Sequence, residues 1–499
     1  PFRLQAGEEV KLVAEIFSHY PAESSIEAVA RWIEVNGVPD LLDLPRGTLE
    51  EEVDFSLTAY MRTLWLEDEG KWYDTLEGEP RLGRYPAFVH QLLLGARCTE
   101  NEERRELYRT RALEALRKVP GAELGLELAF ASGRLKEAMV AETARVKMLM
   151  GSQQPGGYWI FDPDESDGQD TGYRNDSRML GKKGDVEVGT CANSAYEILK
   201  FARISANSEA LDAGLKALEY MRRFKVPRGA QVWEVPVHAP GLLASAQAVL
   251  AYLEGYNLTG DQSHLDDAVR WARAGLPFIY MWNNADMPYM RYASIPVFGA
   301  TWFTSSWFGR AAQRNGLDYA YALLRLSEHD GALPWRKIAT GITTSAMHQR
   351  ENGGDYVALY PDSYDFVTKS KASRWFSPSG ILRNVFTLIG DDPDAKTVIL
   401  RRDGEEVHIS SGARVENARY WRRGISFDLI LRRGETSYCI AVPVAPPDKV
   451  TANRGLLEQV MKLDMADEAW SYDEENRALF IKILHRRERI RVVVRSASG

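Results

Sequence analysis

The feature of this sequence that most constrains its fold is a repeat of paired helical segments in the middle of the chain. Residues 190–203 and 242–256 are rich in Ala and Ser, so each can pack on all sides, whereas the segments that follow them carry charges on one face. Equivalent helices recur every fifty residues or so, roughly the period of stacked helical hairpins. Such alternation of inner and outer helices builds a closed toroid or an open solenoid. The following helices are expected at 209–224 and 264–274, and a third pair at 311–327 and 334–349.

Amphipathic periodicity also predicts helices before this repeat. Thr48 is the expected capping residue of one of them. With the paired helices they make about twelve before residue 390, which is enough for six hairpins, so we expect an (α/α)6-type toroid, mainly α, over residues 1–390. The expected early helices are 8–17, 25–35, 49–64, 86–96, 102–117 and 135–150.

After Asp394 the hydrophobic pattern changes to a period of two. Asp403-Gly404 and Arg433-Gly434 are typical of hairpin turns between strands. Short alternating segments joined by such turns indicate a small antiparallel β-sandwich domain over residues 395–499. The expected strands are 397–400, 406–409, 425–431, 437–442, 478–484 and 490–494.

Composition excludes several classes of partner. The net charge is -8 and no basic stripe dominates, which argues against nucleic acid. Cys98, Cys191 and Cys439 are too few and too far apart for a disulfide framework or a metal motif. No apolar run approaches the roughly 18 residues of a membrane span. The chain is expected to be soluble; no signal peptide is visible, but it begins with Pro1, so cytoplasmic, periplasmic and extracellular locations stay open.

The long loops before the inner helices are the expected location of a functional site, because in a toroid they converge at one end. The first loop, 153–189, contains Trp159 and an acidic run from Asp162 to Asp170, and ends with Asp185 and Glu187. The run faintly resembles a calcium loop, but Asp167 stands where such a loop needs Gly. A solvated acidic loop is the favoured interpretation, and no metal or other cofactor is expected.

The second loop, 228–240, places an aromatic ring, a carboxylate and an imidazole close together. These are Trp233, Glu234 and His238. A carboxyl beside an indole face can have a raised pKa, as a general acid requires. The alternative is structural, with Glu234 paired to Arg228 and His238 partly buried.

The third and fourth loops supply further aromatic and polar candidates. In residues 281–292, Tyr292 next to Arg291 is suited to bind or deprotonate an acidic sugar, and Asp362 in the fourth loop is a candidate second carboxylate. For each aromatic residue singly, core packing is the alternative. The candidate substrate-binding residues of all four loops are Trp159, Trp233, Trp282, Asn284, Tyr289, Arg291, Trp302 and Tyr360.

The overall pattern resembles carbohydrate-active enzymes that have an (α/α) toroid and a C-terminal β-sandwich, among them several glycoside hydrolase and polysaccharide lyase families. The resemblance covers about residues 50–499, and its most suggestive local pieces are 446–455, 470–473 and 479–485, which look like the accessory β-domain of bacterial glycoside hydrolases. No catalytic motif of one family is matched. Residues 154–159 are also similar to the Gln/Trp repeats of triterpene cyclases.

This resemblance implies an enzyme that cleaves glycosidic bonds of a poly- or oligosaccharide. A hydrolase needs two carboxylates about 5 Å or about 6.5–9.5 Å apart. Glu234 as the acid, with its pKa raised by Trp233, and Glu187 as its partner are the favoured pair, and Asp185 and Asp362 are substitutes.

Three other functions are left open by the sequence. A polysaccharide lyase acting on a uronic acid would use His238 or Tyr292 as base, with Arg291 and Asn284 neutralising the carboxylate. A non-catalytic glycan-binding protein would keep the Trp platforms and tolerate loss of Glu234. A terpenoid cyclase would have an apolar cavity. The sugar, the linkage and the oligomeric state are not indicated.

Overall fold

The computed structural model describes residues 26–78, 80–166, 179–282, 290–298, 310–421 and 424–496, and a few isolated positions before residue 26. The expected helix at 8–17 therefore lies largely outside the described residues. The other early helices are present, and the structure adds three short helices that periodicity did not predict, Leu126–Ser132, Pro163–Ser166 and Ser379–Leu388. No described helix combines the length and the apolar character that crossing a membrane requires.

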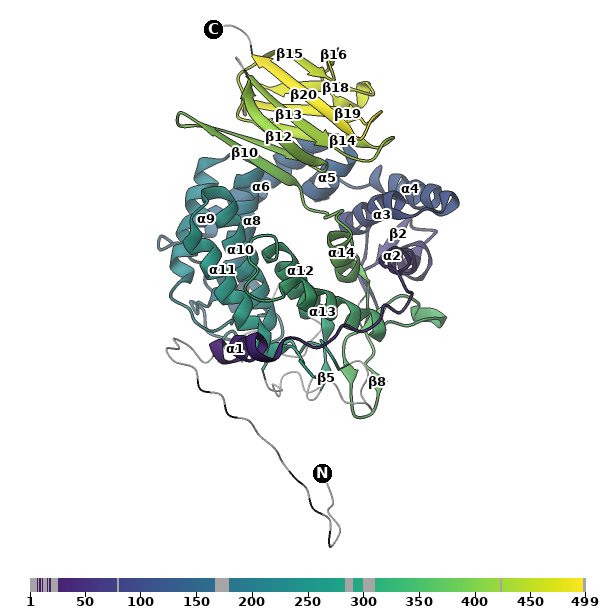
Figure 1. The fold of residues 1–499 in the computed structure, drawn as a ribbon, viewed down its shortest axis with the longest axis vertical. Helices are drawn as coiled ribbons and strands as arrows, with labels where there is room; N and C mark the ends of the chain where they lie inside the picture. Colours follow the sequence, from purple (N-terminus) through teal and green to yellow (C-terminus); the bar gives the residue numbers. More distant parts are fainter. Residues whose placement is uncertain are drawn as a thin grey trace.

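Six of the described helices form the inner ring of a toroid (Figure 1). Neighbours around the ring contact one another, and α6 (Leu135–Ser152) bridges the step from α5 to α8. The small residues predicted for the inner helices explain this close packing, since Ala244, Ala248 and Ala251 of α10 are all fully buried. The ring consists of α3 (Pro86–Cys98), α5 (Leu126–Ser132), α8 (Val188–Ser205), α10 (Leu242–Thr259), α12 (Gln313–Leu326) and α14 (Ser379–Leu388).

Most inner helices pack against the outer helix that directly follows them in the chain, as the paired pattern predicts. The exception is α14, whose outer partner is the early helix α2 (Leu49–Thr58), and this pairing closes the ring. The expected (α/α)6-type toroid is thereby confirmed. The other outer helices are α4 (Glu102–Leu116), α6, α9 (Ser208–Met221), α11 (Gln262–Gly275) and α13 (Trp335–Gln349), and α1 (Ile26–Asn36) packs outside α11.

A buried ion pair holds α2 in the ring. Arg350, directly after α13, is fully buried; its guanidinium pairs with Glu52 of α2 and donates 2.7 Å to Ser56 Oγ. Thr48 caps α2 as expected, because Thr48 and Glu51 form a reciprocal capping box. The helix ends earlier than predicted, at Thr58, and continues as one π-helical turn over Ala59–Thr63.

Two antiparallel-rich sheets follow the toroid and enclose one hydrophobic core, which includes Ile409, Cys439 and Ile481 of the first sheet and Phe427 and Val492 of the second. The first sheet has the order β10 (Lys396–Arg402), β11 (Glu405–Ser411), β14 (Thr436–Val442), β19 (Ala478–Leu484), β18 (Ala469–Asp473), β17 (Glu458–Gln459). The second has the order β12 (Arg414–Trp421), β13 (Gly424–Ile430), β20 (Arg489–Ser496), β15 (Pro447–Ala452), β16 (Gly455–Leu456). Only β17 and β18 pair in parallel among these neighbours.

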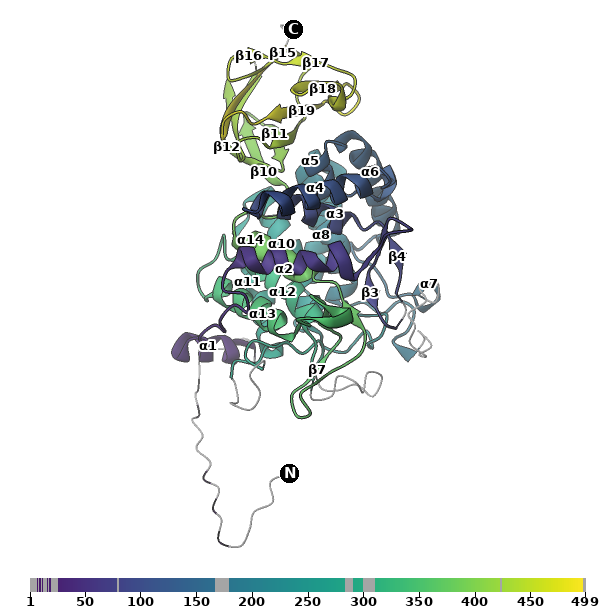
Figure 2. The same cartoon turned by 90° about the vertical axis from the view of Figure 1, so that its right-hand side faces the viewer.

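The β-domain sits on one end of the toroid, and the long loops extend from the other end (Figure 2). Arg203 of α8 joins the two parts: its buried guanidinium donates 2.7 Å to Glu254 of α10 and 2.9 Å to Asp394, just ahead of β10. His408 of β11 completes the contact, with Nδ1 2.7 Å from the Arg203 carbonyl oxygen. The loop end of the toroid is therefore free of the β-domain.

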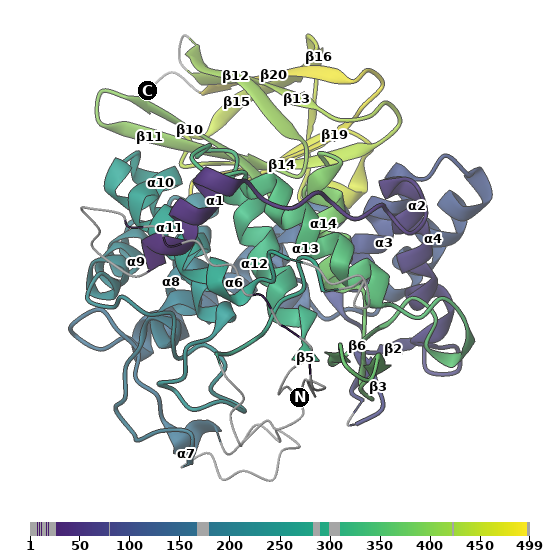
Figure 3. The same cartoon turned by 60° about the horizontal axis from the view of Figure 1, so that its bottom comes forward.

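Short strands organise that loop end (Figure 3). One three-stranded sheet joins β3 (Thr75–Leu76), β9 (Trp375–Phe376) and β6 (Tyr360–Pro361), so it fixes an N-terminal hairpin beside the loop that follows α13. The remaining short elements are β1 (Trp65–Leu66), β2 (Lys71–Tyr73), β4 (Leu82–Gly83), β5 (Arg310–Ala311), β7 (Tyr364–Asp365), β8 (Ser370–Lys371) and α7 (Pro163–Ser166).

Candidate active site

A cavity of about 570 Å³ opens at the loop end of the toroid, a size typical of sites for small ligands. Its walls come from the loop before α10, the first turns of α12 and α14, and the sheet of β3, β9 and β6. Charged side chains of both signs line it, which does not fit the apolar cavity of a cyclase. They are Asp74, Arg81, Glu234, Arg314, Asp318, Asp362, Arg374 and Arg383.

Glu234 reaches this cavity from a loop that is pinned at both ends. Arg228 and Pro240 form an antiparallel bridge, and Gly241 N donates 2.8 Å to the Pro227 carbonyl oxygen. Within the loop, Val235 N donates 3.0 Å to the Gln231 carbonyl oxygen, which makes a tight turn around Glu234. The carboxyl is therefore positioned by backbone bonds, although it lies outside any helix or strand.

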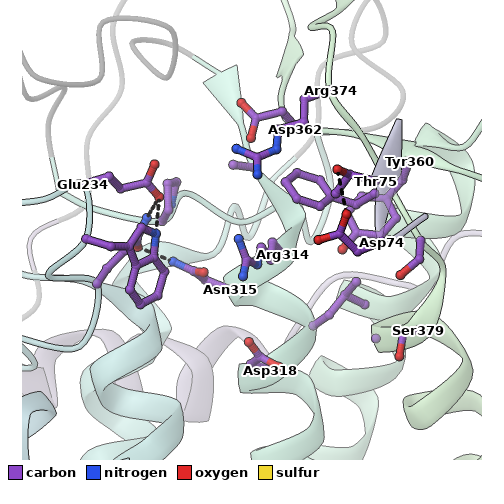
Figure 4. Close-up of a pocket in the computed structure, with 18 of the residues that line it drawn as sticks. Asp74, Thr75, Glu234, Arg314, Asn315, Asp318, Tyr360, Asp362, Arg374 and Ser379 are labelled. Carbon is purple, nitrogen blue, oxygen red and sulfur yellow. Dashed lines mark hydrogen bonds between the residues drawn. The ribbon is translucent and has the colours of Figure 1, made fainter. Parts of the chain in front are cut away.

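Only one oxygen of the Glu234 carboxyl accepts hydrogen bonds from the residues that the structure describes. Gln231 Nε2 donates 2.6 Å and Trp233 Nε1 donates 3.2 Å, both to Oε1 (Figure 4). Asn315, in the first turn of α12, in turn donates 2.6 Å to Gln231 Oε1. No described residue donates to Glu234 Oε2, which leaves that oxygen available to a ligand in the cavity.

Burial raises the pKa of Glu234, which is only 6% exposed, and the negative charge of Asp362 raises it further. The hydrogen bonds from Gln231 and Trp233 act in the opposite direction, as does the charge of Arg314. The expected raised pKa is thus present, but the expected cause is wrong: the indole N–H stabilises the carboxylate and lowers the pKa.

Asp362 lies in the same cavity as Glu234, just after β6 (Figure 4). Its backbone N–H donates 2.8 Å to the Arg374 carbonyl oxygen, which ties it to the strand pair β6–β9. Tyr360 of β6 also lines the cavity, and burial raises its pKa well above the usual range. The structure therefore brings together two of the predicted carboxylates and two predicted aromatic residues, Trp233 and Tyr360.

Three other predicted residues form a separate cluster that does not line the cavity. His238 lies between two carboxylates, with Nδ1 2.8 Å from Glu187 Oε1 and Nε2 3.3 Å from Asp185 Oδ2. Arg228 approaches the same Glu187 oxygen at 3.7 Å. Gly229 permits this contact between the two loops, because a Cβ there would lie 2.7 Å from the Glu187 Cβ. The cluster joins the loop before α8 to the loop that carries Glu234.

Several predicted ligand contacts are located elsewhere. Trp159 is a core residue whose Nε1 donates 3.0 Å to the Leu149 carbonyl oxygen, so it offers no exposed ring face. Tyr292 is fully buried and its hydroxyl donates 2.5 Å to the Pro39 carbonyl oxygen, while neighbouring Arg291 donates 3.1 Å to the Asp40 carbonyl oxygen.

Trp282 is 59% exposed but does not line the cavity. Trp233 does line it, and Asn284, Tyr289 and Trp302 lie outside the described residues.

The acidic run of the first loop is only partly described. Asp162 pairs with Lys183 at 2.6 Å, and Asp167 and Asp170 lie outside the described residues. Within the part of the chain that the structure describes, no group of three or more His, Cys, Asp or Glu side chains is arranged to hold a metal ion.

Sequence analysis assigned no role to several residues of the cavity. Gln231 and Asn315 position Glu234, and Arg314 and Arg374 supply positive charge. Arg314 and Asn315 stand at the start of a predicted inner helix, which was an available signal. Asp74 follows a short strand in the N-terminal third of the chain, and no local pattern marks it.

Comparisons with known proteins give likenesses of structure only. No family model matches the sequence, and no curated protein matches it. An unsaturated glucuronyl hydrolase from Bacillus sp. GL1 is 12% identical with a TM-score of 0.47, over 68% of this chain and 97% of that one. The enzyme of that name from Streptococcus agalactiae is 11% identical with a TM-score of 0.46, over 73% and 96%. A GH76 α-mannanase from Bacteroides thetaiotaomicron is 8% identical with a TM-score of 0.44, over 69% and 96%.

Proposed function

We propose that this protein is a glycoside hydrolase in which Glu234 is the proton donor and Asp362 is the second carboxylate. The observation that supports the proposal is the state of Glu234: a buried carboxyl with a raised pKa, held through one oxygen, at the wall of a cavity that also contains Asp362. A general acid must stay protonated near the pH at which it works, and burial and the charge of another carboxylate shift the pKa in the direction that this requires.

In this proposal the proton moves from Glu234 Oε2 to the glycosidic oxygen as the bond to the anomeric carbon breaks. Asp362 then either takes a proton from a water that attacks the anomeric carbon, or attacks that carbon itself and forms an ester that water later hydrolyses. Gln231 and Trp233 hold Oε1, so the carboxyl keeps its orientation during the transfer. Their hydrogen bonds also stabilise the carboxylate that remains.

The aromatic residues of the cavity are suited to contact a sugar ring. Trp233 and Phe376 both line it, and Tyr360 packs beside Phe376 with ring centroids 5.7 Å apart. A partly buried indole can present an apolar face to the C–H groups of a sugar while its N–H remains bonded to Glu234. Trp233 therefore serves both the orientation of the acid and the binding of the substrate.

Elimination by a lyase is less well supported by the same geometry. The two bases expected for it are separated from the cavity, since His238 is paired with Glu187 and Asp185, and Tyr292 lies in the core. Tyr360 is in the cavity, but burial raises its pKa, whereas a tyrosine base needs a lowered one. A carboxyl acid with a partner carboxylate matches hydrolysis better.

A polysaccharide panel tests the proposal when each reaction is followed in two ways. Reducing ends report cleavage of either kind, and ultraviolet absorbance of an unsaturated uronic product reports elimination alone. Wild type is compared with Glu234→Gln, which keeps the shape of the side chain. Reducing ends without absorbance, lost in Glu234→Gln, support hydrolysis. Absorbance that rises with the reducing ends would show a lyase, and activity that survives in Glu234→Gln would remove Glu234 from the mechanism.

A further inference from the structure

Among the residues that the structure describes, Arg314 and Arg374 of the cavity form no ion pair, in contrast to Arg383. Arg383 donates 2.8 Å to Asp318, so its charge is balanced. By contrast, neither the Arg314 nor the Arg374 side chain makes a hydrogen bond or an ion pair with any residue that the structure describes. The cavity thus contains two guanidinium groups that no carboxylate of the described residues approaches within ion-pairing distance, although the charge of Arg314 does act on Glu234.

Aromatic rings hold both of these side chains in place. The Arg314 guanidinium carbon lies 5.8 Å from the ring centroid of Trp233 and 5.4 Å from that of Phe376, and the Arg374 guanidinium carbon lies 5.5 Å from the Phe376 centroid. Stacking orients a guanidinium through its face and leaves the N–H groups at its edge free to donate. The two arginines therefore share Phe376 and keep their donors for a ligand.

The backbone at Arg374 is strained. Its φ is +87°, a left-handed conformation that a residue with a long side chain rarely adopts. The carbonyl oxygen of Arg374 accepts the Asp362 N–H at 2.8 Å, and its Nε is buried without a partner. Strain of this kind persists where the surrounding structure imposes it and is concentrated at functional sites. Here the strained residue holds, through its carbonyl oxygen, the backbone N–H of the proposed second carboxylate.

We propose that Arg314 and Arg374 bind the anionic group of an acidic sugar residue, a carboxylate or a sulfate ester, beside the bond that Glu234 protonates. The inference rests on the proposed hydrolase function and adds the substrate class. Guanidinium edges match the paired oxygens of such groups, and charge-assisted hydrogen bonds are stronger than neutral ones. Burial raises the pKa of Glu234, which favours its uncharged form and so weakens repulsion of an anionic ligand.

Calorimetric binding to full-length Glu234→Gln protein, which is used to prevent turnover, tests this inference. The probes are oligogalacturonate and its carboxyl-reduced form, and chondroitin sulfate oligosaccharides before and after desulfation. We expect at least one acidic probe to bind and its neutralised form to bind roughly tenfold more weakly or worse. The oligogalacturonate pair tests whether a carboxylate is recognised, and the chondroitin sulfate pair tests whether a sulfate ester is recognised.

Arginine variants then locate the binding. Arg314→Gln and Arg374→Gln should each lower affinity for the acidic probe roughly tenfold or more and leave affinity for the neutral form unchanged. Arg223→Gln is the matched control, because Arg223 also stacks on an aromatic ring, 4.4 Å from the Tyr220 centroid, but lies outside the cavity. It should bind every probe as the parent protein does.

The outcomes separate this inference from the proposed function. The inference is overturned if no acidic probe binds, if neutralised probes bind equally well, or if the arginine variants weaken both forms alike. If any of these results is obtained but neutral glycans are hydrolysed in a Glu234-dependent reaction, the proposed hydrolase function is supported and the acidic substrate class is contradicted. If an acidic probe binds through the two arginines but wild type never cleaves it, the acidic ligand is supported and the proposed hydrolase function is contradicted.

Discussion

Gln231 and Glu234 are joined by a hydrogen bond of 2.6 Å from Nε2 to Oε1, and Asn315 fixes the orientation of the Gln231 amide by donating to its oxygen. Two elements far apart in the chain, the loop before α10 and the first turn of α12, thereby determine where one carboxyl oxygen lies. No described residue donates a hydrogen bond to the other oxygen. Interactions of this kind orient a catalytic group without touching the substrate.

The first prediction concerns Gln231 itself. Gln231→Ala removes a donor that stabilises the ionised carboxyl, so the pKa of Glu234 should rise further and the alkaline limb of the pH–rate profile should move to higher pH. The rate at the optimum should fall roughly 10–100-fold, because the acid is no longer held in position. The control is Gln153→Ala, whose amide donates to the Ala213 carbonyl oxygen outside the cavity. An unchanged profile would exclude the positioning role.

Asp362→Asn should move the alkaline limb of the pH–rate profile to lower pH. The negative charge of Asp362 raises the pKa of Glu234, so its removal should lower that pKa, and activity should be lost at a lower pH than in wild type. The rate should also fall strongly, because the second carboxylate is absent. Both effects are read from one pH–rate profile. A variant as active as wild type would show that another group fills this role.

Glu187→Gln distinguishes the pair favoured by the sequence from the pair that shares the cavity. Glu187 bonds to His238 and does not line the cavity, so its substitution should reduce kcat/KM far less than the roughly 10²–10⁴-fold expected for a general acid. The melting temperature should fall instead, because the contact between two loops is weakened. His238→Asn should show the same pattern. Loss of activity with an unchanged melting temperature would restore Glu187 as a candidate.

The junction between the toroid and the β-domain should dominate stability. Arg203→Met leaves the buried Glu254 without its partner and leaves Asp394 paired with Lys200 alone, at 3.1 Å, which should cost about 3–5 kcal/mol of unfolding free energy. Arg31→Met removes a pair whose side chains are 49% and 35% exposed, and should cost about 0–1 kcal/mol. Denaturant unfolding of the full chain measures both. Equal shifts of the two midpoints would contradict a structural role for the buried pair.

Local sequence patterns predicted most helices of the toroid because inner and outer helices differ in composition. They did not predict α5 and α14, which are too short to show several periods. Closure of the ring was expected only from the number of helices. The placement of α2 beside α14 also involves Arg350, which follows α13 and pairs with Glu52 of α2, a contact between residues about 300 positions apart that no local pattern encodes.

The candidate site was predictable only in part for a similar reason. Trp233-Glu234 before an inner helix was a usable signal, and Asp362 was found as a substitute. The preference for Glu187 followed from its place directly before α8, but its side chain turns to His238 instead of the cavity. Asp74 and Arg374 reach the cavity only because β3 pairs with β9, which a linear pattern cannot show.

A comparison of leaving groups tests the role of Glu234 as proton donor. With the sugar identified from the panel, Glu234→Gln and wild type are each assayed on the glycan and on the dinitrophenyl glycoside of the same sugar, whose leaving group needs no proton. We expect Glu234→Gln to lose roughly 10²–10⁴-fold on the glycan and far less on the dinitrophenyl glycoside. Equal losses on the two substrates, or no loss on the glycan, would contradict the assignment of Glu234 as the general acid.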